Sequence, residues 1–518
     1  MSRVPTLAQR WQPGYGVAGI LSSAVHSRPD ETYLEDRFGV SLTYSETEAA
    51  VRRLAFYLDK HGVKRGDRVG IHMSNRAEIA VALYAVSLLG GIYVVLNANL
   101  KPKGLVKILD QAEPVAVIAD DTTVENIGQE FEIKTKIVVS GETVPEGWVS
   151  WEDAQHSPSQ MGGWHGFDVD AACLVFTSGS TGTPRGVTLS HENICYVVGA
   201  IQDRLNYQSE DTIGCFLPLA FDYGLYQIFL AAQAGAKLYI GDPGQVGPRL
   251  PQVMKEAGVS VLPGVPSVYA ALIALGRRKP LELPELRAIT NTGERLPLSY
   301  IEEMQNMFPG LEVFVMYGLT ECKRVSIMKP CEFSEHSDSV GRPLAGTEVY
   351  AVDEEGNRLP AGEVGELVVR GRHVALGYWK AREETAKRFR KRAPEAAVEL
   401  FTGDSGSVDE DGFIYFSARS DDWLKHRGNR ISPVEIENEA CTIDGIVEAS
   451  LHQRESDDTL HLFVTRSDDG IDEKAILKAL SETLEPAKVP DAIRILEEMP
   501  KSINGKIDRK ALAGTLAE

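Results

Sequence analysis

The sequence predicts an α/β protein with a large N-terminal domain and a small C-terminal domain. Short apolar runs alternate with helix-length segments through the first part of the chain, which is typical of layered, mixed or parallel sheets covered by helices. From residue 345 to 418, short alternating strands separated by glycine turns predict a β-rich subdomain. A compact α+β pattern follows over 422–518. We therefore expect an N-terminal domain over 1–418, a boundary at 419–421, and a mobile C-terminal domain.

The individual elements support this fold class in chain order. Residues 26–63 contain a strand-like start and then apolar residues at helical spacing, and GDRVGIHM (66–73) predicts the next strand. Further short apolar strands, each running into a polar or glycine-containing turn, are predicted within 172–179, 236–242, 260–267, 286–294 and 313–318. In open α/β sheets, ligands bind at the carboxyl ends of such strands.

Composition excludes several classes of function. The chain has 518 residues, 43% of them hydrophobic, and a formal net charge of −20, which argues against a nucleic-acid partner. No apolar run approaches the length of a membrane span. The six cysteines show no metal-binding spacing, so we expect reduced thiols in a cytoplasmic protein. The start of the chain does not have a signal-peptide pattern, and GYGVAG (14–19) follows no apolar strand, so it does not predict a dinucleotide site.

A strand at 173–176 leads into TSGSTGTPRG (177–186), which predicts a phosphate-binding loop. Its glycines let backbone N–H groups turn inward to make an anion nest. Its hydroxyls add neutral donors and its arginine adds charge. Read alone, the segment could also be a hydroxyl-rich surface loop, which is the less favoured alternative. The candidate phosphate-binding residues are Thr177, Ser178, Gly179, Ser180, Thr181, Gly182 and Arg185.

Four further segments, taken with this loop, make nearly the whole chain resemble the adenylate-forming superfamily. This superfamily includes acyl-CoA synthetases, peptide-synthetase adenylation domains and luciferases. The segments are MYGLTE (316–321), TGD (402–404), ARSDDWLKHRGNRISPVEIE (418–437) and PKSINGKIDRKAL (500–512). Several ordered motifs at family-like separations are far more specific than any one of them. One departure is Arg185, which stands where the family more often has lysine.

The resemblance implies a chemistry that needs ATP and Mg²⁺. A carboxylate attacks the α-phosphate of ATP to give an acyl-adenylate, and charge builds on the phosphoryl oxygens. Lys506 is implied to bridge the carboxylate and the α-phosphate, and Thr320 to bond that phosphate. Glu321 is the implied Mg²⁺ ligand, because a hard cation takes carboxylate oxygens together with phosphate oxygens.

The resemblance also assigns the nucleoside. Asp404 is implied to accept both ribose hydroxyls, with Arg419 in support, although an Asp after glycine is also a common turn residue. Tyr317 would stack near the adenine. The other implied nucleotide-binding residues are Asn291, Thr292, Gly293, Glu294 and Gly318.

A second half-reaction is implied at the boundary, where Arg419-Ser420-Asp421 resembles the family's hinge, with Asp421 as the hinge residue. Rotation there would replace Lys506 by the segment containing Lys425 and Gly428, which would line a tunnel for a pantetheine thiol. That thiol belongs to CoA or to a carrier protein. Ala418 departs from the family's usual glycine. The basic segment KRFRKR (387–392) could meet a CoA phosphate or an acidic carrier protein, but a solvated helix face is the simpler expectation.

The acid-binding residues are expected in LPLAFDYGLYQ (217–227). By the resemblance, Phe221 would take the aromatic position near the acid's carboxylate. Asp222 falls where amino-acid-activating members carry an aspartate that pairs with the substrate amine, and a buried aspartate needs a partner, although Tyr223 could supply one. Gly224 is expected to leave room in the pocket. The wall would include Cys322, whereas its two successors, Lys323 and Arg324, are expected to face solvent.

The leading hypothesis is an ATP- and Mg²⁺-dependent acid–thiol ligase that makes an acyl-adenylate and transfers the acyl group to CoA. An alternative is a free-standing amino-acid adenylating enzyme that loads carrier-protein phosphopantetheine. A third is a non-adenylating relative that performs only the thioester-forming step.

Overall fold

The computed structural model describes most of the chain. The described residues are 16–127, 133–139, 143–158, 166–177, 184–393, 395–419, 424–426, 429–454, 459–466, 470–486, 488–502 and 506–516. Within them, no helix combines the length and apolarity needed to cross a membrane.

Eight strands form the first sheet, in the spatial order β19-β9-β8-β4-β3-β5-β6-β7. Strands β8, β4, β3, β5, β6 and β7 are parallel neighbours, and β9 and β19 add antiparallel pairs at one edge. Their bounds are β3 Arg68–Met73, β4 Ile92–Asn97, β5 Ala116–Asp120, β6 Thr135–Val139, β7 Val149–Ser150, β8 Ala171–Thr177, β9 Arg185–Ser190 and β19 Gly377–Tyr378.

Nine strands form the second sheet, in the order β16-β15-β14-β13-β12-β10-β11-β1-β2. Its centre is parallel from β1 to β14, and antiparallel pairs close both edges. Their bounds are β1 Thr32–Asp36, β2 Ser41–Thr43, β10 Thr212–Cys215, β11 Lys237–Ile240, β12 Val261–Gly264, β13 Ala288–Asn291, β14 Glu312–Tyr317, β15 Ser326–Ile327 and β16 Arg342–Pro343.

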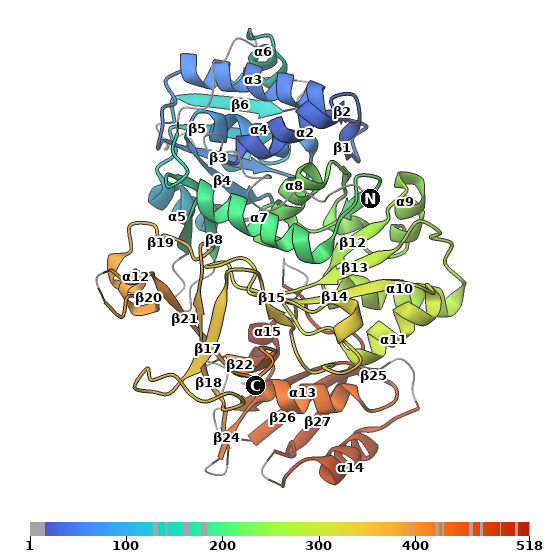
Figure 1. Cartoon of the computed structure of the whole chain (residues 1–518). Coiled ribbons are helices and arrows are strands. Elements are labelled where there is room, and N and C mark those ends of the chain that lie inside the picture. The colour runs from blue at the N-terminus through green and yellow to red at the C-terminus, as the bar shows by residue number, and fades with distance from the viewer. Residues whose placement is uncertain are drawn as a thin grey trace, which may run out of the picture.

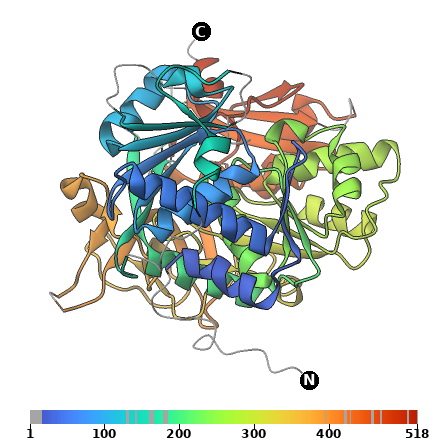
Figure 2. The same cartoon turned by 90° about the horizontal axis from the view of Figure 1, so that it is seen from above.

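Helices cover these two sheets and pack between them (Figures 1 and 2). They are α2 Ala18–Ser27, α3 Tyr44–Lys60, α4 Ala77–Leu88, α5 Pro102–Ala112, α6 Trp151–Gln155, α7 His191–Leu205, α8 Asp222–Ala234, α9 Leu250–Ala257, α10 Pro266–Arg278, α11 Leu298–Met307 and α12 Arg382–Arg388. Three single 3₁₀ turns are η1 Val124–Asn126, η2 Pro243–Gln245 and η3 Pro330–Glu332.

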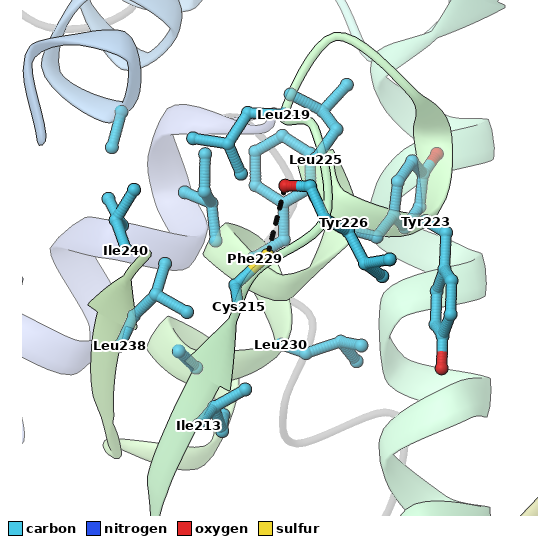
Figure 3. Packing of buried hydrophobic residues seen from close by; sticks show 14 of the residues in the cluster. Ile213, Cys215, Leu219, Tyr223, Leu225, Tyr226, Phe229, Leu230, Leu238 and Ile240 are labelled. Carbon is cyan, nitrogen blue, oxygen red and sulfur yellow. Dashed lines mark hydrogen bonds between the residues drawn. The ribbon is translucent and has the colours of Figure 1, made fainter. Parts of the chain in front are cut away.

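One hydrophobic core joins the two sheets. Helix α4 is buried on every face, as expected for a helix that is apolar all round. Helix α8 is also mostly buried, and Figure 3 shows its Phe229 beside Cys215 of β10. Because α8 is held on several sides, the residues at its N-terminus have a fixed position at the edge of the second sheet.

A smaller antiparallel sheet follows, with β18 and β21 at its centre. The strands are β17 Glu348–Val352, β18 Gly365–Arg370, β20 Phe389–Arg390, β21 Glu399–Val408 and β22 Ile414–Arg419. Its core includes Leu367, Val369 and Leu400, and it continues into the turn after β14 through Cys322 and Val325. This sheet therefore lies against the carboxyl end of β14.

The elements after residue 424 have a hydrophobic core of their own, which includes Ile436, Leu462 and Ile476. They are β23 Leu424–His426, β24 Asn429–Ile431, α13 Pro433–Cys441, β25 Ile446–Arg454, β26 Thr459–Arg466, α14 Glu473–Thr483, β27 Ala492–Leu496 and α15 Arg509–Gly514. In Figure 1 they lie beneath α11 and the small antiparallel sheet, and Tyr300 Oη of α11 donates to Val447 O at 3.0 Å.

The α/β fold class predicted from the alternating pattern is confirmed, since layered, largely parallel sheets carry helices and a β subdomain follows them. The division at 419–421 stays a prediction. The separate core after residue 424 supports it.

Candidate functional site

The predicted nucleotide-binding segments meet because two parallel strands end side by side. Strands β13 and β14 are neighbours in register, so the turns that follow Asn291 and Tyr317 leave the same edge of the sheet. The small antiparallel sheet supplies the opposite side through β21. Residues far apart in the sequence are thus brought together at one edge.

The candidate ribose-binding carboxylate is held in place before any ligand arrives. Asp404, on β21, is 2% exposed, and its Oδ2 accepts a 2.6 Å hydrogen bond from Tyr317 Oη. Burial and the neighbouring carboxylate raise the pKa of Tyr317 well above its ordinary value, so the phenol keeps its proton and remains a donor. Tyr317 therefore has a second role beside the predicted stacking on adenine, because its hydroxyl orients Asp404. Arg419 lies opposite Asp404 in the β21–β22 ladder.

The stretch after β13 offers unsatisfied polar groups. Asn291 is fully buried, and among the described residues neither its Oδ1 nor its Nδ2 has a hydrogen-bond partner. A buried amide left unpaired is costly, and a heterocycle with an amino group and ring nitrogens could satisfy both of its atoms. The donor and acceptor set at Asn291 therefore fits an adenine base.

Lys506 reaches this stretch from the C-terminal part of the chain. Its Nζ donates to Gly293 O at 3.2 Å, and the next residue, Ile507, donates its N–H to Glu294 Oε1 at 3.3 Å. Loss of solvation raises the pKa of Glu294, an effect that Lys506 and Lys501 oppose. The structure thus places the predicted catalytic lysine at the carboxyl end of β13.

Glu321, the candidate metal ligand, lies beside a tyrosine hydroxyl and an arginine. Its Oε1 accepts a 2.7 Å hydrogen bond from Tyr378 Oη and is 3.9 Å from Arg388 Nη1. No group of three acidic, histidine or cysteine residues among the described parts of the chain could hold a metal alone. Mg²⁺ commonly binds through one or two carboxylates plus phosphate oxygens, so Glu321 fits a metal that arrives with a nucleotide.

The turn after β14 is too tight for a side chain at its first residue. A Cβ at Gly318 would overlap the backbone of Lys323 and Arg324, and Lys323 has a left-handed φ of 63°. This conformation folds the segment back on itself, so that the half-buried Thr320 and Glu321 occupy the outside of the turn.

The structure describes only the two ends of the predicted phosphate loop. Thr177 ends β8 and Arg185 begins β9, and these two residues are partners in the ladder. Arg185 Nη2 lies 3.3 Å from Glu384 Oε2, and its guanidinium carbon is 5.7 Å from the centre of the Tyr378 ring. The remaining loop residues lie outside the described residues: Ser178, Gly179, Ser180, Thr181 and Gly182.

The acid-binding segment contradicts one prediction. Lys323 and Arg324, expected to face solvent, are 4% and 7% exposed. Lys323 Nζ lies 3.8 Å from Asp222 Oδ2 and 5.2 Å from the centre of the Tyr226 ring. The tight turn after β14 is the reason, because it points both side chains back toward the N-terminus of α8.

Arg324 is held by the turn after β13 and by helix α8. Its Nη1 donates to Thr292 Oγ1 at 2.6 Å, and its guanidinium carbon is 5.3 Å from the centre of the Tyr223 ring. Burial lowers the pKa of Arg324. Tyr223 Oη is 2.7 Å from Thr290 Oγ1 and also donates to Thr290 O, which orients Tyr223 by the protein alone.

Two other predictions need correction. Gly224 does not leave room in a pocket, because a Cβ there would come within 2.5 Å of Pro218 O; the glycine allows α8 to approach the preceding backbone. Cys322 is fully buried among apolar residues of the β subdomain, so its thiol is part of a core. Phe221 precedes α8 as its N-cap residue and is half-buried.

The basic segment 387–392 is not a plain solvated face. Arg388 Nη1 donates to Thr402 O at 3.0 Å, Arg392 Nε donates to Glu399 Oε2 at 2.9 Å, and Arg390 lies 4.0 Å from the centre of the Phe401 ring. Each arginine therefore contacts β21 of its own subdomain.

Four predicted residues cannot be placed by their side chains. Asp421 and Gly428 lie outside the described residues, and the side chains of Arg419 and Lys425 do as well. Two site residues were missed from the sequence: Tyr378 and Arg388, which both contact Glu321. They lie between the motifs, and only contacts in the folded chain identify them.

Comparisons with known proteins bear on the family and the fold of the chain. The family model described as AMP-binding enzyme matches residues 21–379. The chain is 30% identical over 509 residues to Delta-poly-L-ornithine synthetase of Acinetobacter baumannii (strain AB307-0294), covering 96% of this chain and 36% of the synthetase. The chain thus spans about a third of the length of that relative.

Two solved structures share the fold. The anthranilate CoA ligase AuaEII in complex with anthranoyl-AMP has a TM-score of 0.88 at 25% identity, covering 98% of both chains. VinN in complex with L-aspartate has a TM-score of 0.69 at 33% identity, covering 79% of this chain and 99% of that one.

Proposed function

Because the chain belongs to the AMP-binding enzyme family, whose members form adenylates, we propose that it activates an amino acid that carries a second carboxylate. The observation that supports this proposal is the group at the N-terminus of α8 formed by the buried Lys323 and Arg324 and the half-buried Asp222.

The charges of this group do not balance by themselves. Two cations, Lys323 and Arg324, face one carboxylate, Asp222, which is 27% exposed by its side chain. The Lys323–Asp222 distance of 3.8 Å is an ion pair without a hydrogen bond, and among the described residues Lys323 Nζ has no hydrogen-bond partner. Buried charges need both pairing and hydrogen bonds, so the site is completed by a further anionic group.

The reacting carboxylate does not supply that anionic group. During adenylation it must lie at the α-phosphate, near Lys506 and Thr320, at the ends of β13 and β14. A second carboxylate on the same molecule can pair with Lys323 and Arg324, while Asp222 accepts hydrogen bonds from an ammonium group. A second carboxylate gives two cations and two anions, counting Asp222. The ammonium group of a dicarboxylic amino acid adds one further positive charge, which Asp222 would accept by hydrogen bonding. The complex of VinN with L-aspartate supports this assignment.

The adenylation step follows from the placed residues. Asp404 accepts the ribose hydroxyls, Asn291 pairs with the base, and Glu321 would hold Mg²⁺, which when bound offsets charge on the phosphate oxygens. Lys506 brings its ammonium to the carboxylate and the α-phosphate, where negative charge develops as the carboxylate oxygen attacks phosphorus and pyrophosphate leaves. The products are an acyl-adenylate and pyrophosphate.

A thiol then accepts the acyl group and AMP leaves. We propose the phosphopantetheine of a carrier protein, because an amino-acid pocket is typical of carrier-loading enzymes. CoA, favoured by the sequence, is the second candidate, and the similarity to the anthranilate CoA ligase over 98% of the chain supports it.

The experiment is ATP–pyrophosphate exchange with four sets of acids: dicarboxylic amino acids, monocarboxylic amino acids, dicarboxylic acids without an amine, and aryl acids. We expect exchange with the first set. Lys323→Met should lower its kcat/KM by about 100-fold, as expected for an unpaired charged hydrogen-bonding group, whereas Lys279→Met, at an exposed lysine, should have no effect. Exchange confined to aryl or plain acids would refute the proposal.

Mass spectrometry of the thioester identifies the acceptor. The enzyme is given its acid, ATP and either CoA or a phosphopantetheinylated carrier protein. A mass increase on the carrier protein alone supports carrier loading, and acyl-CoA alone supports the second candidate.

A further inference from the structure

We propose that Arg388, at the C-terminal end of α12, binds a phosphate group of the nucleotide. The sequence singles out the basic segment 387–392 that contains Arg388, but none of the nucleotide-binding motifs includes this residue. The inference rests on the proposed function in one respect, namely that the chain binds ATP between Glu321 and Asp404.

One side of the Arg388 guanidinium lies on the turn that carries the ribose carboxylate. Its Nη1 donates to Thr402 O at 3.0 Å. The next residue, Gly403, has a left-handed φ of 71°, and a Cβ there would come within 3.0 Å of Arg388 Nη2. Arg388 therefore occupies the space that a side chain at 403 would take, directly before Asp404.

The nitrogen that donates to Thr402 O also faces the candidate metal ligand. Arg388 Nη1 is 3.9 Å from Glu321 Oε1, too far for a hydrogen bond. That oxygen is already bonded by Tyr378 Oη at 2.7 Å. Glu321 thus attracts Arg388 electrostatically and leaves its N–H groups available for a closer acceptor.

The guanidinium has unused donor capacity. An arginine carries five N–H donors in a planar fork, and the one hydrogen bond found for this side chain among the described residues is to Thr402 O. About a third of the side chain is exposed to solvent. An anion that enters between Glu321 and Asp404 therefore meets a cation whose remaining donors point to no protein acceptor in the described chain.

The position identifies that anion as phosphate. A nucleotide with its ribose at Asp404 and its metal ion at Glu321 must run its phosphate chain between them, past Arg388. Two carboxylates line this path and would repel a polyanion, so a cation between them is needed to lower the electrostatic cost. The nearby Arg185 already faces Glu384 of the same helix at 3.3 Å. Helix α12 thus supplies Arg388 to the phosphates and a carboxylate to Arg185.

Calorimetric titration of the whole protein tests this assignment without the acid or thiol. ATP, AMP and adenosine are titrated with Mg²⁺ into the natural protein, Arg388→Met, Arg388→Lys and Arg390→Met. Arg390 is the matched control, since it lies two residues away and contacts the Phe401 ring. Thermal unfolding of each variant checks that it is folded.

We expect Arg388→Met to weaken ATP binding by about 10-fold or more, the loss of one charged hydrogen bond, and to leave adenosine binding unchanged. Arg388→Lys should recover part of the loss, and Arg390→Met should match the natural protein. The AMP result identifies the phosphate: an equal loss for AMP assigns the α-phosphate, and an unchanged AMP affinity assigns the outer phosphates.

Two results would overturn the inference. Equal weakening of adenosine and ATP would make Arg388 a residue that only positions the Thr402–Asp404 turn. Unchanged ATP affinity in a folded Arg388→Met protein would remove Arg388 from the nucleotide site. Failure of the natural protein to bind ATP would instead refute the proposed function, and the two failures are therefore distinguishable.

Discussion

Tyr317 Oη, at the end of β14, donates a 2.6 Å hydrogen bond to Asp404 Oδ2 on β21. The two residues are buried and come from different sheets, the second large sheet and the small antiparallel sheet. This bond fixes both the distance between the sheets at the site and the rotamer of the candidate ribose ligand.

Replacing Tyr317 by Phe removes the hydroxyl and leaves the Asp404 carboxylate short of a donor in a buried place. We expect the free energy of unfolding to fall by about 1–3 kcal/mol, the cost of an unsatisfied buried group, and nucleotide affinity to fall as Asp404 loses its orientation. Urea unfolding and ATP titration measure the two effects. Tyr239→Phe, at a half-buried tyrosine of β11, is the control, and equal behaviour of both variants would contradict this role.

Lys506→Ala should abolish adenylation while sparing transfer of the acyl group from a synthetic acyl-adenylate. The reason is that Lys506 Nζ, now bonded to Gly293 O at 3.2 Å, is the cation proposed to meet the charge that builds during the first step. Pyrophosphate exchange and thioester formation are assayed separately. Lys510→Ala, at an exposed lysine of α15, should behave as the natural protein. Normal exchange in Lys506→Ala would show that the lysine assignment is wrong.

Lys323→Met should separate stability from activity. In the free protein, Lys323 is a buried cation whose carboxylate partner is 3.8 Å away, and replacing such a residue by an apolar one of similar volume is often neutral or stabilising. We therefore expect an unchanged or higher unfolding temperature together with the loss of dicarboxylic substrates. Calorimetric unfolding measures the unfolding temperature, and pyrophosphate exchange measures the loss of dicarboxylic substrates. A drop of several degrees would indicate that Asp222 depends on Lys323 more strongly than the geometry suggests.

Glu294 should make stability fall as pH rises. Burial raises the pKa of Glu294 in the folded protein, so its ionisation opposes folding. The stabilising contribution is complete below the unfolded-state pKa and is lost as pH rises through the folded-state pKa. The groups that face it are Lys506, Lys501 and Glu448. Glu294→Gln should abolish this part of the pH dependence in urea unfolding, while Glu302→Gln, at an exposed glutamate, should keep it.

Gly224→Ala should destabilise the protein by about 1–3 kcal/mol, the usual cost of forcing an extra methyl group into a packed place. Its Cβ would come within 2.5 Å of Pro218 O, so α8 or the preceding loop must shift, and with it Asp222. Gly514→Ala in α15 is the matched control, because a Cβ there meets open space. If both variants unfold at the same urea concentration, the close approach at Gly224 is not a constraint.

Much of the fold follows from local patterns. Apolar runs such as 68–73 and 313–317 become parallel strands because their residues can be buried on both faces of a covered sheet. The candidate nucleotide site was predictable for the same reason, since Asn291 and Tyr317 end neighbouring parallel strands.

The directions of individual side chains were not predictable in this way. A run of two basic residues usually faces solvent, and only the left-handed backbone at Lys323 turns it and Arg324 inward. Tyr378 and Arg388 reach Glu321 from a separate segment, and no spacing in the sequence encodes that meeting. The prediction for Gly224 was wrong because the backbone of Pro218, in the preceding loop, lies too close to residue 224 to allow a side chain there. The sequence does not show this approach.

The pairing of Asp404 with Arg419 across β21 and β22 has a consequence for the handling of a reactive product. If the predicted hinge at 419–421 lets the C-terminal part rotate, the candidate ribose-binding carboxylate, Asp404, would stay in the stationary part. The acyl-adenylate could then remain bound to the N-terminal part while the C-terminal part rotates and presents a different surface to the site. A labile mixed anhydride would thus be protected from bulk water between its formation and its use.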